Sequence, residues 1–219
     1  PYRGEVRKNG STDNFYLAMI YSTVRTVLVG VDANRIFEAF RGDALVTFNL
    51  IGYTDENVGF LTNAANMTAG LYGQWSLKDA SAYIPSGSTG VICFLFNNYL
   101  GDSFYGGIRK NGSTDEYTYG CIRVADVTAG KFFVYQLCGV DENRYFRAKL
   151  QNAQVRCYLI GYTLAPVTFF TNGVDKSLAS TDIWVDVDCT AETTSDADGA
   201  ILFMLNTGAS YSHKGADRK

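Results

Sequence analysis

One motif occurs twice, almost letter for letter, in this chain of 219 residues. It reads VRKNGSTD at residues 6–13 and IRKNGSTD at residues 108–115. Later motifs return 109 positions further on: GVDANRIF as GVDENRYF, LIGYT unchanged, FLTN as FFTN, and ICFLFN as ILFMLN. Solenoid and propeller repeats are about 20–50 residues long, whereas this spacing has the size of a whole small domain. The repeat therefore predicts two homologous domains.

The expected domain boundaries follow from the matched motifs. We expect tandem modules at residues 1–101 and 102–211, followed by a polar tail at residues 212–219. The tail SHKGADRK aligns with SFYGGIRK at residues 103–110 and keeps its Gly, Arg and Lys. It is a degenerate third copy of the strand that opens each module.

Composition and patterning both favour β-structure. Tyr, Phe, Val and Thr are frequent, Gly, Asn and Asp punctuate the chain, and 47% of the residues are apolar, which is enough for a core. In RYFRAKLQ, the residues Phe146, Ala148 and Leu150 alternate with Arg147 and Lys149, the pattern of a half-buried strand. The apolar runs VICFLF and AILFML indicate strands covered on both faces. The predicted fold class is all-β, with two tandem β-sandwich modules of jelly-roll or immunoglobulin-like type.

Turn chemistry accounts for two of the repeated motifs. Asn-Gly in KNGS is typical of a type I′ hairpin turn, which would place Val6 opposite Asp13. VDANR and VDENR predict a second turn, in which Asp32 or Asp141 accepts hydrogen bonds from its own backbone. A ligand-binding loop is the alternative interpretation of these motifs.

Charge and hydropathy exclude several classes of partner. The net charge is −3 and the sequence contains no basic tract, so the footprint of a nucleic-acid binder is missing. No run of 18 apolar residues could span a membrane as a helix. The opening residues PYRGEVRK lack both an initiator Met and the apolar core of a signal peptide, so we expect a processed or trimmed chain.

Five cysteines occur, at positions 93, 121, 138, 157 and 189. Four of them align with apolar residues of the other copy: Cys93 with Leu202, Cys138 with Val29, Cys157 with Phe48, and Cys189 with Ala80. Free cysteine packs as a small hydrophobe, so we expect these four in the core rather than in disulfides. The chain has no CxxC pair and no Cys/His cluster that would predict zinc.

Two groups of residues are candidate ligand sites. Trp75 and Trp184 hold equivalent positions, where a core role is favoured and a platform that stacks on sugar rings is the alternative. The stretch DIWVDVDCTAETTSDADG could offer hard oxygen ligands to Ca²⁺, the only cofactor that we consider. Its aspartates are Asp186, Asp188, Asp196 and Asp198. The first copy has a single carboxylate there, so a solvated loop is favoured over a metal site.

No catalytic constellation is recognisable in the sequence. The only histidine, His213, lies in the polar tail, and neither a nucleophile elbow nor a phosphate-binding loop occurs. We therefore expect a protein that is not an enzyme. An evolutionary remnant is the favoured interpretation of the surplus opening strand. The alternative is self-assembly by strand addition or exchange, in which residues 1–8 are the donor because Tyr2 and Val6 keep an apolar face.

The series RKNGSTD, GVDxNR and LIGYT resembles tandem β-sandwich repeats of phage or environmental-virus virion and tail-associated proteins. The resemblance covers both modules and implies a structural or adhesive role in a virion or on an extracellular surface, without catalytic residues. A self-assembling structural protein is thus the leading hypothesis. A carbohydrate-binding protein with two modules, which would take glycans as partners, is the alternative.

Overall fold

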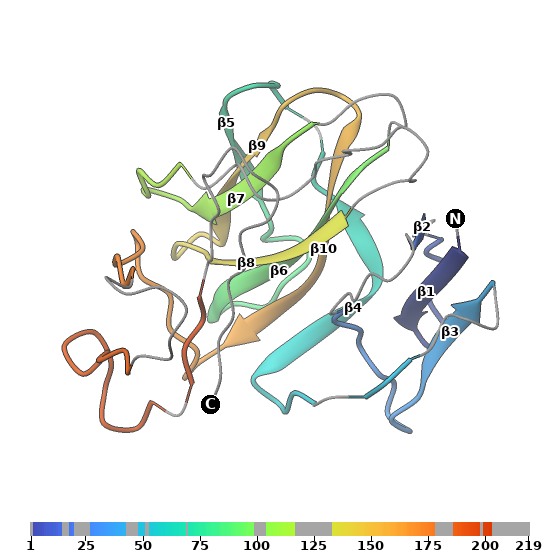
Figure 1. Ribbon diagram of the computed structural model, residues 1–219, viewed down its shortest axis with the longest axis horizontal. Helices are drawn as coiled ribbons and strands as arrows, with labels where there is room; N and C mark the ends of the chain where they lie inside the picture. Colours follow the sequence, from blue (N-terminus) through green and yellow to red (C-terminus); the bar gives the residue numbers. More distant parts are fainter. Residues whose placement is uncertain are drawn as a thin grey trace.

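The computed structural model confirms that the chain is all-β (Figure 1). It describes residues 2–14, 18–19, 27–42, 48–50, 53–68, 70–98, 104–116, 133–177, 186–197 and 199–202. These residues form ten strands and no helix. The strands are β1 (Tyr2–Lys8), β2 (Ala18–Met19), β3 (Phe37–Arg41), β4 (Val58–Asn66), β5 (Trp75–Asp79), β6 (Ser88–Asn97), β7 (Gly106–Lys110), β8 (Phe133–Gly139), β9 (Tyr145–Leu150) and β10 (Val155–Leu164).

Seven of these strands, β4 to β10, form a β-sandwich that we call the central unit. One sheet has the order β4-β10-β6-β8 and the other the order β5-β9-β7, and all neighbouring strands are antiparallel. Figure 1 shows the smaller sheet lying over the larger one. Residues of both sheets share one hydrophobic core, among them Phe146 of β9, Cys93 of β6 and Leu159 of β10.

The predicted strand patterns hold in this unit. Phe146, Ala148 and Leu150 of β9 are buried, while the charged residues between them are partly exposed. After a turn at residues 151–154, β10 alternates in the same way. The apolar run of β6 is buried on both faces, because the sandwich core covers one side and a second cluster covers the other.

That second cluster is aromatic. Phe94 and Phe133 form its buried centre, with ring centroids 5.5 Å apart, and Phe96, Tyr135 and Tyr158 pack around them. Val27, from the N-terminal part of the chain, also packs against the cluster. The outer face of the larger sheet is therefore a packing surface for the preceding part of the chain.

Both sheets of the central unit combine strands from the two sequence copies. Strands β4, β5 and β6 come from the first copy, and strands β7 to β10 come from the second. The expected boundary between residues 101 and 102 thus lies between β6 and β7 of a single unit. The expectation of two complete sandwiches, one for each copy, stays a prediction.

The remaining parts of the two copies flank the central unit. We call residues 2–14, 18–19, 27–42, 48–50 and 53–55 the N-terminal half-unit, and residues 167–177, 186–197 and 199–202 the C-terminal half-unit. In the former, β1 pairs with β3 so that Val6 lies opposite Ala39, which is the register that Ile108 of β7 keeps with Ala148 of β9. The N-terminal half-unit therefore repeats the β7–β9 part of the central unit.

The C-terminal half-unit corresponds by sequence to β4, β5 and β6, but its described residues form no strand. The expected strand in AILFML is absent at Ala200, Ile201 and Leu202, and its other three residues lie outside the described part of the chain. The physical reason is the missing support. In the central unit, β6 is hydrogen-bonded to β10 on one edge and to β8 on the other, and the described chain places no such neighbours beside residues 199–202.

The cysteines follow the same division. Cys93, Cys138 and Cys157 are buried in the central unit with free thiols, as the comparison of the two copies predicts. Burial raises the pKa of the Cys138 thiol well above its ordinary value, so this thiol stays protonated. Cys189 is free but only partly buried, so the expected core position is wrong for this residue in the isolated chain. Cys121 lies outside the described residues.

Candidate functional site

The turn in RKNGSTD has a different geometry from the expected one. The backbone N–H of Ser11 donates to the carbonyl oxygen of Lys8 at 2.9 Å, and only Gly10 has a positive φ, of 79°. A type I′ turn needs positive φ at Asn9 as well, so the turn is closer to type II, which requires it at the third residue alone. The chain then leaves the strand direction, and β1 pairs with β3 instead of with residues 11–13. The expected hairpin is therefore wrong.

Instead, the turn fastens itself to a segment some 50 residues further along the chain. The backbone N–H of Thr12 donates to Oδ1 of Asn63 at 2.8 Å, and the backbone N–H of Ala64 donates to Oδ2 of Asp13 at 2.7 Å. The Lys8 ammonium donates to the carbonyl oxygen of Phe60 at 3.1 Å. The hydroxyl of Ser11 also donates to Oδ1 of Asn63, at 3.2 Å. Four of the eight residues of the motif thus hold residues 60–64 of β4.

The second copy makes the same contacts with its own later segment. The backbone N–H of Thr114 donates to Oδ1 of Asn172 at 2.8 Å, and that of Gly173 donates to Oδ2 of Asp115 at 2.8 Å. The Lys110 ammonium donates to the carbonyl oxygen of Phe169 at 3.2 Å. We call this duplicated set of contacts the polar joint.

A glycine completes the polar joint in each copy. A Cβ atom built on Gly30 would lie 2.4 Å from Cβ of Phe60, and one built on Gly139 would lie 2.6 Å from Cβ of Phe169. Both distances are too short for any side chain, because the phenylalanine packs directly on the glycine backbone. The glycine of GVDxNR is therefore required by close packing and not by a turn.

The aspartate of GVDxNR organises the adjacent turn, as the sequence predicts. Oδ1 of Asp141 accepts hydrogen bonds from the backbone N–H groups of Asn143, at 3.0 Å, and Tyr145, at 2.8 Å. Its Oδ2 accepts one from the side chain of Asn111 in the KNGS turn, at 2.8 Å. Partial burial of Asp141 opposes ionisation, but these hydrogen bonds outweigh it and hold the pKa of the carboxyl below its ordinary value.

Asp32 repeats the arrangement with Asn9, and the hydrogen bond from Asn9, followed by that from the backbone of Ile36, lowers the pKa of its carboxyl. Both turns contain an arginine in the left-handed region, with φ of 64° at Arg35 and 67° at Arg144. Such a conformation is uncommon outside glycine and asparagine, and no residue pattern in the motif predicts it.

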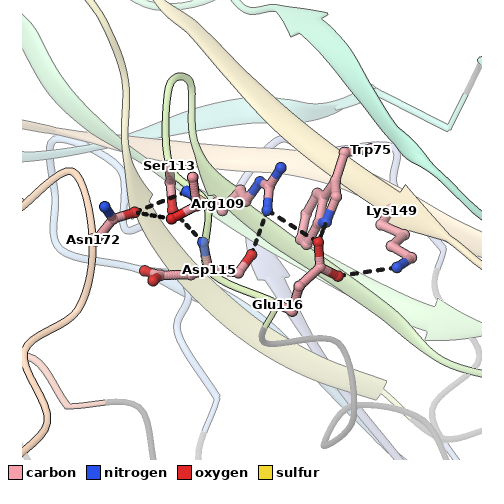
Figure 2. Close-up of polar contacts among 8 residues, drawn as sticks. Trp75, Arg109, Ser113, Asp115, Glu116, Lys149 and Asn172 are labelled. Carbon is pink, nitrogen blue, oxygen red and sulfur yellow. Dashed lines mark hydrogen bonds and ion pairs between the residues drawn. The ribbon is translucent and has the colours of Figure 1, made fainter.

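Trp75 lies beside the polar joint of the second copy (Figure 2). The guanidinium carbon of Arg109 stands 4.1 Å from the centre of the indole ring, and the indole N–H donates to Glu116 at 2.7 Å. Lys149 forms an ion pair with Glu116 at 3.0 Å. Hydrogen bonds from Lys149 and Trp75 hold the pKa of Glu116 below its ordinary value, so this network is charged at neutral pH.

Figure 2 shows how the two groups of contacts meet at Arg109. Ser113, Asp115 and Asn172 lie on one side of the guanidinium, and Trp75, Glu116 and Lys149 lie on the other. Arg109 donates to the carbonyl oxygen of Asp115 at 2.5 Å, as Arg7 does to that of Asp13 at 3.0 Å. Arg109 therefore connects the cluster of Trp75, Glu116 and Lys149 with the polar joint.

A sugar platform is the alternative role for the two tryptophans. Trp75 is half-buried, and one face of its ring is covered by Arg109, which is a cation–π contact rather than an open stacking surface. Its equivalent, Trp184, lies outside the described residues. The two tryptophans therefore stay an untested prediction as ligand-binding residues.

The aspartates considered as alternative Ca²⁺ ligands make local contacts where they are described. Oδ1 of Asp188 accepts from the backbone N–H of Thr190 at 2.9 Å, and Oδ1 of Asp196 accepts from the hydroxyl of Ser195 at 3.0 Å. The described residues, which include Asp186 but not Asp198, contain no group of three or more metal-ligating side chains. A calcium site in this stretch remains a prediction.

The expected assembly strand occupies the middle of its sheet. The order is β2-β1-β3, with Tyr2 paired to Met19 and Val6 paired to Ala39. Val6 is half-buried, and the side chain of Tyr2 lies outside the described part of the structure. Within the described residues the outer strands of this sheet are β2 and β3, and β2 pairs only with Tyr2 and Arg3 of β1.

The polar joint was not anticipated from the sequence, although the sequence carries its signal. Its members Asn63 and Asn172, and likewise Gly30 and Gly139, recur at the same spacing as the motifs around them. In both copies the polar groups of the joint bond to one another or to the backbone, an arrangement suited to holding two segments together. His213 lies outside the described residues.

Comparisons with known proteins add no identity. No protein-family model matches the chain, and no curated protein is significantly similar to it. Among the described residues, no helix is long and apolar enough to cross a membrane. The functional argument therefore rests on the geometry of the molecule.

Proposed function

We propose that this chain is a non-enzymatic structural protein that self-assembles. The observation that carries the proposal is the duplicated polar joint, because the same three hydrogen bonds form between equivalent groups at two places in one chain. A repeated set of contacts that holds each unit to the next is suited to an extended, regular assembly. Enzymes, by contrast, place such polar groups where a substrate can reach them.

The interleaving of the two copies supports the same proposal. Because β4, β5 and β6 pair with strands of the following copy, successive copies are held together by main-chain hydrogen bonds and a shared core. Separating the two sequence copies would therefore require the central unit to unfold. This mechanical continuity suits a virion component or an extracellular surface protein, the setting to which the resemblance of the repeated motifs points.

Sedimentation velocity of the full chain over a range of concentrations tests the proposal. We expect species larger than the monomer whose share grows with concentration, since association follows mass action. A chain that stays monomeric at every concentration contradicts the proposed role.

An adhesive role by glycan binding is the alternative function. The partly exposed Trp75 beside Glu116 and Lys149 has the residue types of a sugar site, but these groups already satisfy one another. A glycan array with the full chain and its Trp75→Ala variant decides between the two. Binding that disappears in the variant would support the alternative, and no binding by either protein would exclude it for the glycans displayed.

A further inference from the structure

The two half-units expose apolar residues whose equivalents in the central unit are buried. Leu50 is 86% exposed, whereas Leu159, the first residue of the second LIGYT motif, is 0% exposed. Phe37 is 37% exposed, whereas its equivalent Phe146 is 0% exposed. The identical residue type in the identical motif is thus solvent-accessible at one place and fully buried at the other.

The C-terminal half-unit shows the same contrast. Ile201 and Leu202 are 55% and 57% exposed, whereas their equivalents Ile92 and Cys93 are 1% and 0% exposed in the middle of β6. Nothing surrounds a Cβ atom built on Gly199, whereas one built on its equivalent Gly90 would meet the ring of Phe169. Both half-units therefore have the sequence of a sandwich core without the partner that closes it.

The central unit shows which partner each half-unit needs. There the counterparts of the N-terminal half-unit, β9 and β10, pair with β5, β4 and β6, which are the counterparts of the C-terminal half-unit. The core cluster joins the equivalents of Phe37 and Leu202, namely Phe146 and Cys93. The two half-units are thus complementary parts of one more unit.

We propose that the C-terminal half-unit of a second copy of this chain completes the N-terminal half-unit of the first into a sandwich equivalent to the central unit. The proposal rests on the proposed structural function and specifies its interface. Residues 186–188 then pair along the open edge of β3, as β5 pairs along β9. Residues 199–202 form the strand that matches β6, and both half-units bury the apolar residues that they now expose.

The occupant is a second copy because the two half-units of one chain cannot easily meet. Figure 1 shows β1 and β3 at one side of the central unit and the C-terminal half-unit, in orange and red, at the opposite side. The polar joint holds Phe169 and Asn172 against the strands of the central unit, so this segment is fixed on its side. Pairing between chains is then head-to-tail, a heterologous contact that produces rings or open filaments.

The register of β5 on β9 specifies the new contact. Leu77 lies opposite Arg147 and Asp79 lies opposite Tyr145. The equivalent positions place Asp186 of the second copy opposite Glu38. Arg7, which already pairs with Glu38, supplies the positive charge beside these two carboxylates.

Two charge substitutions test the interface in the full chain. Phe37→Asp alters the accepting half-unit and Leu202→Asp alters the inserting one, and each would leave an unpaired carboxylate in the completed core. Because an unpaired buried charge is strongly unfavourable, we expect either variant to weaken association by at least about a hundredfold. Leu77→Asp is the control, since Leu77 is 49% exposed in β5 and its equivalent is already Asp186.

Mixing the two variants distinguishes a head-to-tail interface from every other kind. The Phe37→Asp chain keeps an intact inserting half-unit and the Leu202→Asp chain keeps an intact accepting one. We expect each variant alone to be monomeric and an equimolar mixture to form dimers and nothing larger, as measured by sedimentation velocity. A mixture that stays monomeric, or a single variant that assembles like the unmodified chain, overturns the proposal.

Thiol labelling gives a second readout that does not depend on a charge substitution. Cys189 is partly exposed, but its equivalent Ala80 is 0% exposed, so completion of the unit must bury this thiol. In the Cys121→Ser variant, we expect maleimide to label Cys189 rapidly in dilute solution and at least about tenfold more slowly in the assembled state. Equal labelling rates in the two states overturn the proposal.

The outcomes separate this inference from the proposed function. Assembly of the unmodified chain that neither substitution weakens would leave the structural role intact and refute the interface. A compact monomer in which Cys189 is already protected would show that the chain closes on itself, which also refutes the second copy as occupant. A monomer with Cys189 exposed at all concentrations would contradict both proposals.

Discussion

Leu50 and Leu159 begin the same five-residue motif, yet the first is exposed to solvent and the second is at the centre of a core. Leu159 lies in β10 between β4 and β6, whereas Leu50 belongs to a half-unit without these two neighbours. The comparison of the central unit with its flanking half-units shows that long-range strand pairing decides burial here. The local sequence makes a residue apolar enough for a core, but the pairing of distant strands determines whether that residue is buried.

The polar joint behaves in the opposite way. Its contacts in the two copies agree to within about 0.1 Å, although one joint borders the N-terminal half-unit and the other borders the C-terminal half-unit. The joint therefore does not require the units on both sides of it to be complete. It is formed within one copy, whereas the sandwich is formed between two.

The largest expected effect comes from truncating the two equivalent leucines. Leu159→Ala removes a fully buried side chain and should lower the free energy of unfolding by about 2–5 kcal/mol. Leu50→Ala removes an exposed one and should change it by no more than about 0.5 kcal/mol in the dilute chain. Urea denaturation followed by far-ultraviolet circular dichroism measures both. Equal losses would break the comparison between the central unit and the half-unit.

The next effect concerns the glycine of the polar joint. Gly139→Ala forces Phe169 off the backbone and should cost about 1–3 kcal/mol, because the neighbouring Cβ atom would be only 2.6 Å away. Gly199→Ala is the control, since nothing surrounds a Cβ atom there. Limited proteolysis should cut the segment after β10 faster in Gly139→Ala than in the unmodified chain. The cleavage rate of Gly199→Ala should equal that of the unmodified chain. An unaffected Gly139→Ala variant would show that the joint tolerates loosening.

A smaller effect is expected from the asparagine side chain that accepts a hydrogen bond from the KNGS turn. Asn172→Ala leaves the backbone N–H of Thr114 without its side-chain acceptor and should cost about 1 kcal/mol. The Thr114 amide should then exchange its hydrogen faster, while β9 keeps its protection. Asn57→Ala, in the turn before β4, is the matched control, since the side-chain amide of Asn57 donates to Asp55 in its own turn, at 3.3 Å. Unchanged exchange at Thr114 would mean that the bond contributes nothing to the joint.

The cation–π contact should contribute less than the hydrogen bonds. Trp75→Phe keeps an aromatic ring under Arg109 but loses the indole N–H that Glu116 accepts. We expect a loss of about 0.5–1 kcal/mol by thermal denaturation, in the range of exposed cation–π pairs and single hydrogen bonds. A loss several times larger would make this network part of the core instead of its edge.

The smallest effect is a dependence on pH. The pKa of Asp141 is lower in the folded protein than its ordinary value of 3.8. Its contribution to stability is therefore fully present above pH 5 or so and is lost as the pH falls through the folded-state pKa. Urea midpoints between neutral and acidic pH should fall less steeply for Asp141→Asn than for the unmodified chain. A steeper fall in the variant would reverse the sign of this argument.

The elements of the fold could be predicted from the sequence, but not the way in which they group. Alternation identified β9, and the double-sided apolar run identified β6, because strand periodicity reflects which faces are buried. A repeat gives a spacing but no starting point, so any window of one period is an equally valid unit. The pairing of β4 with β10 joins a strand of the first copy to a strand of the second, which the spacing of the motifs does not reveal.

The candidate site was less predictable for a related reason. Asp32 and Asp141 act on their own turns, so local sequence revealed them. Asn63, Asn172 and the glycines of GVDxNR act on segments far along the chain, and their roles depend on three-dimensional contact. The position of Trp75 also depends on such contact, because Arg109 of β7 packs over its ring.

Hydrogen–deuterium exchange of the dilute full chain tests the central claim most directly, because it reports which amides open together. We predict that β4, β6, β8, β9 and β10 form one slowly exchanging group drawn from both sequence copies, while β3 and residues 199–202 exchange quickly. Protection that instead divides between residues 101 and 102, with β3 as slow as β9, would contradict the account.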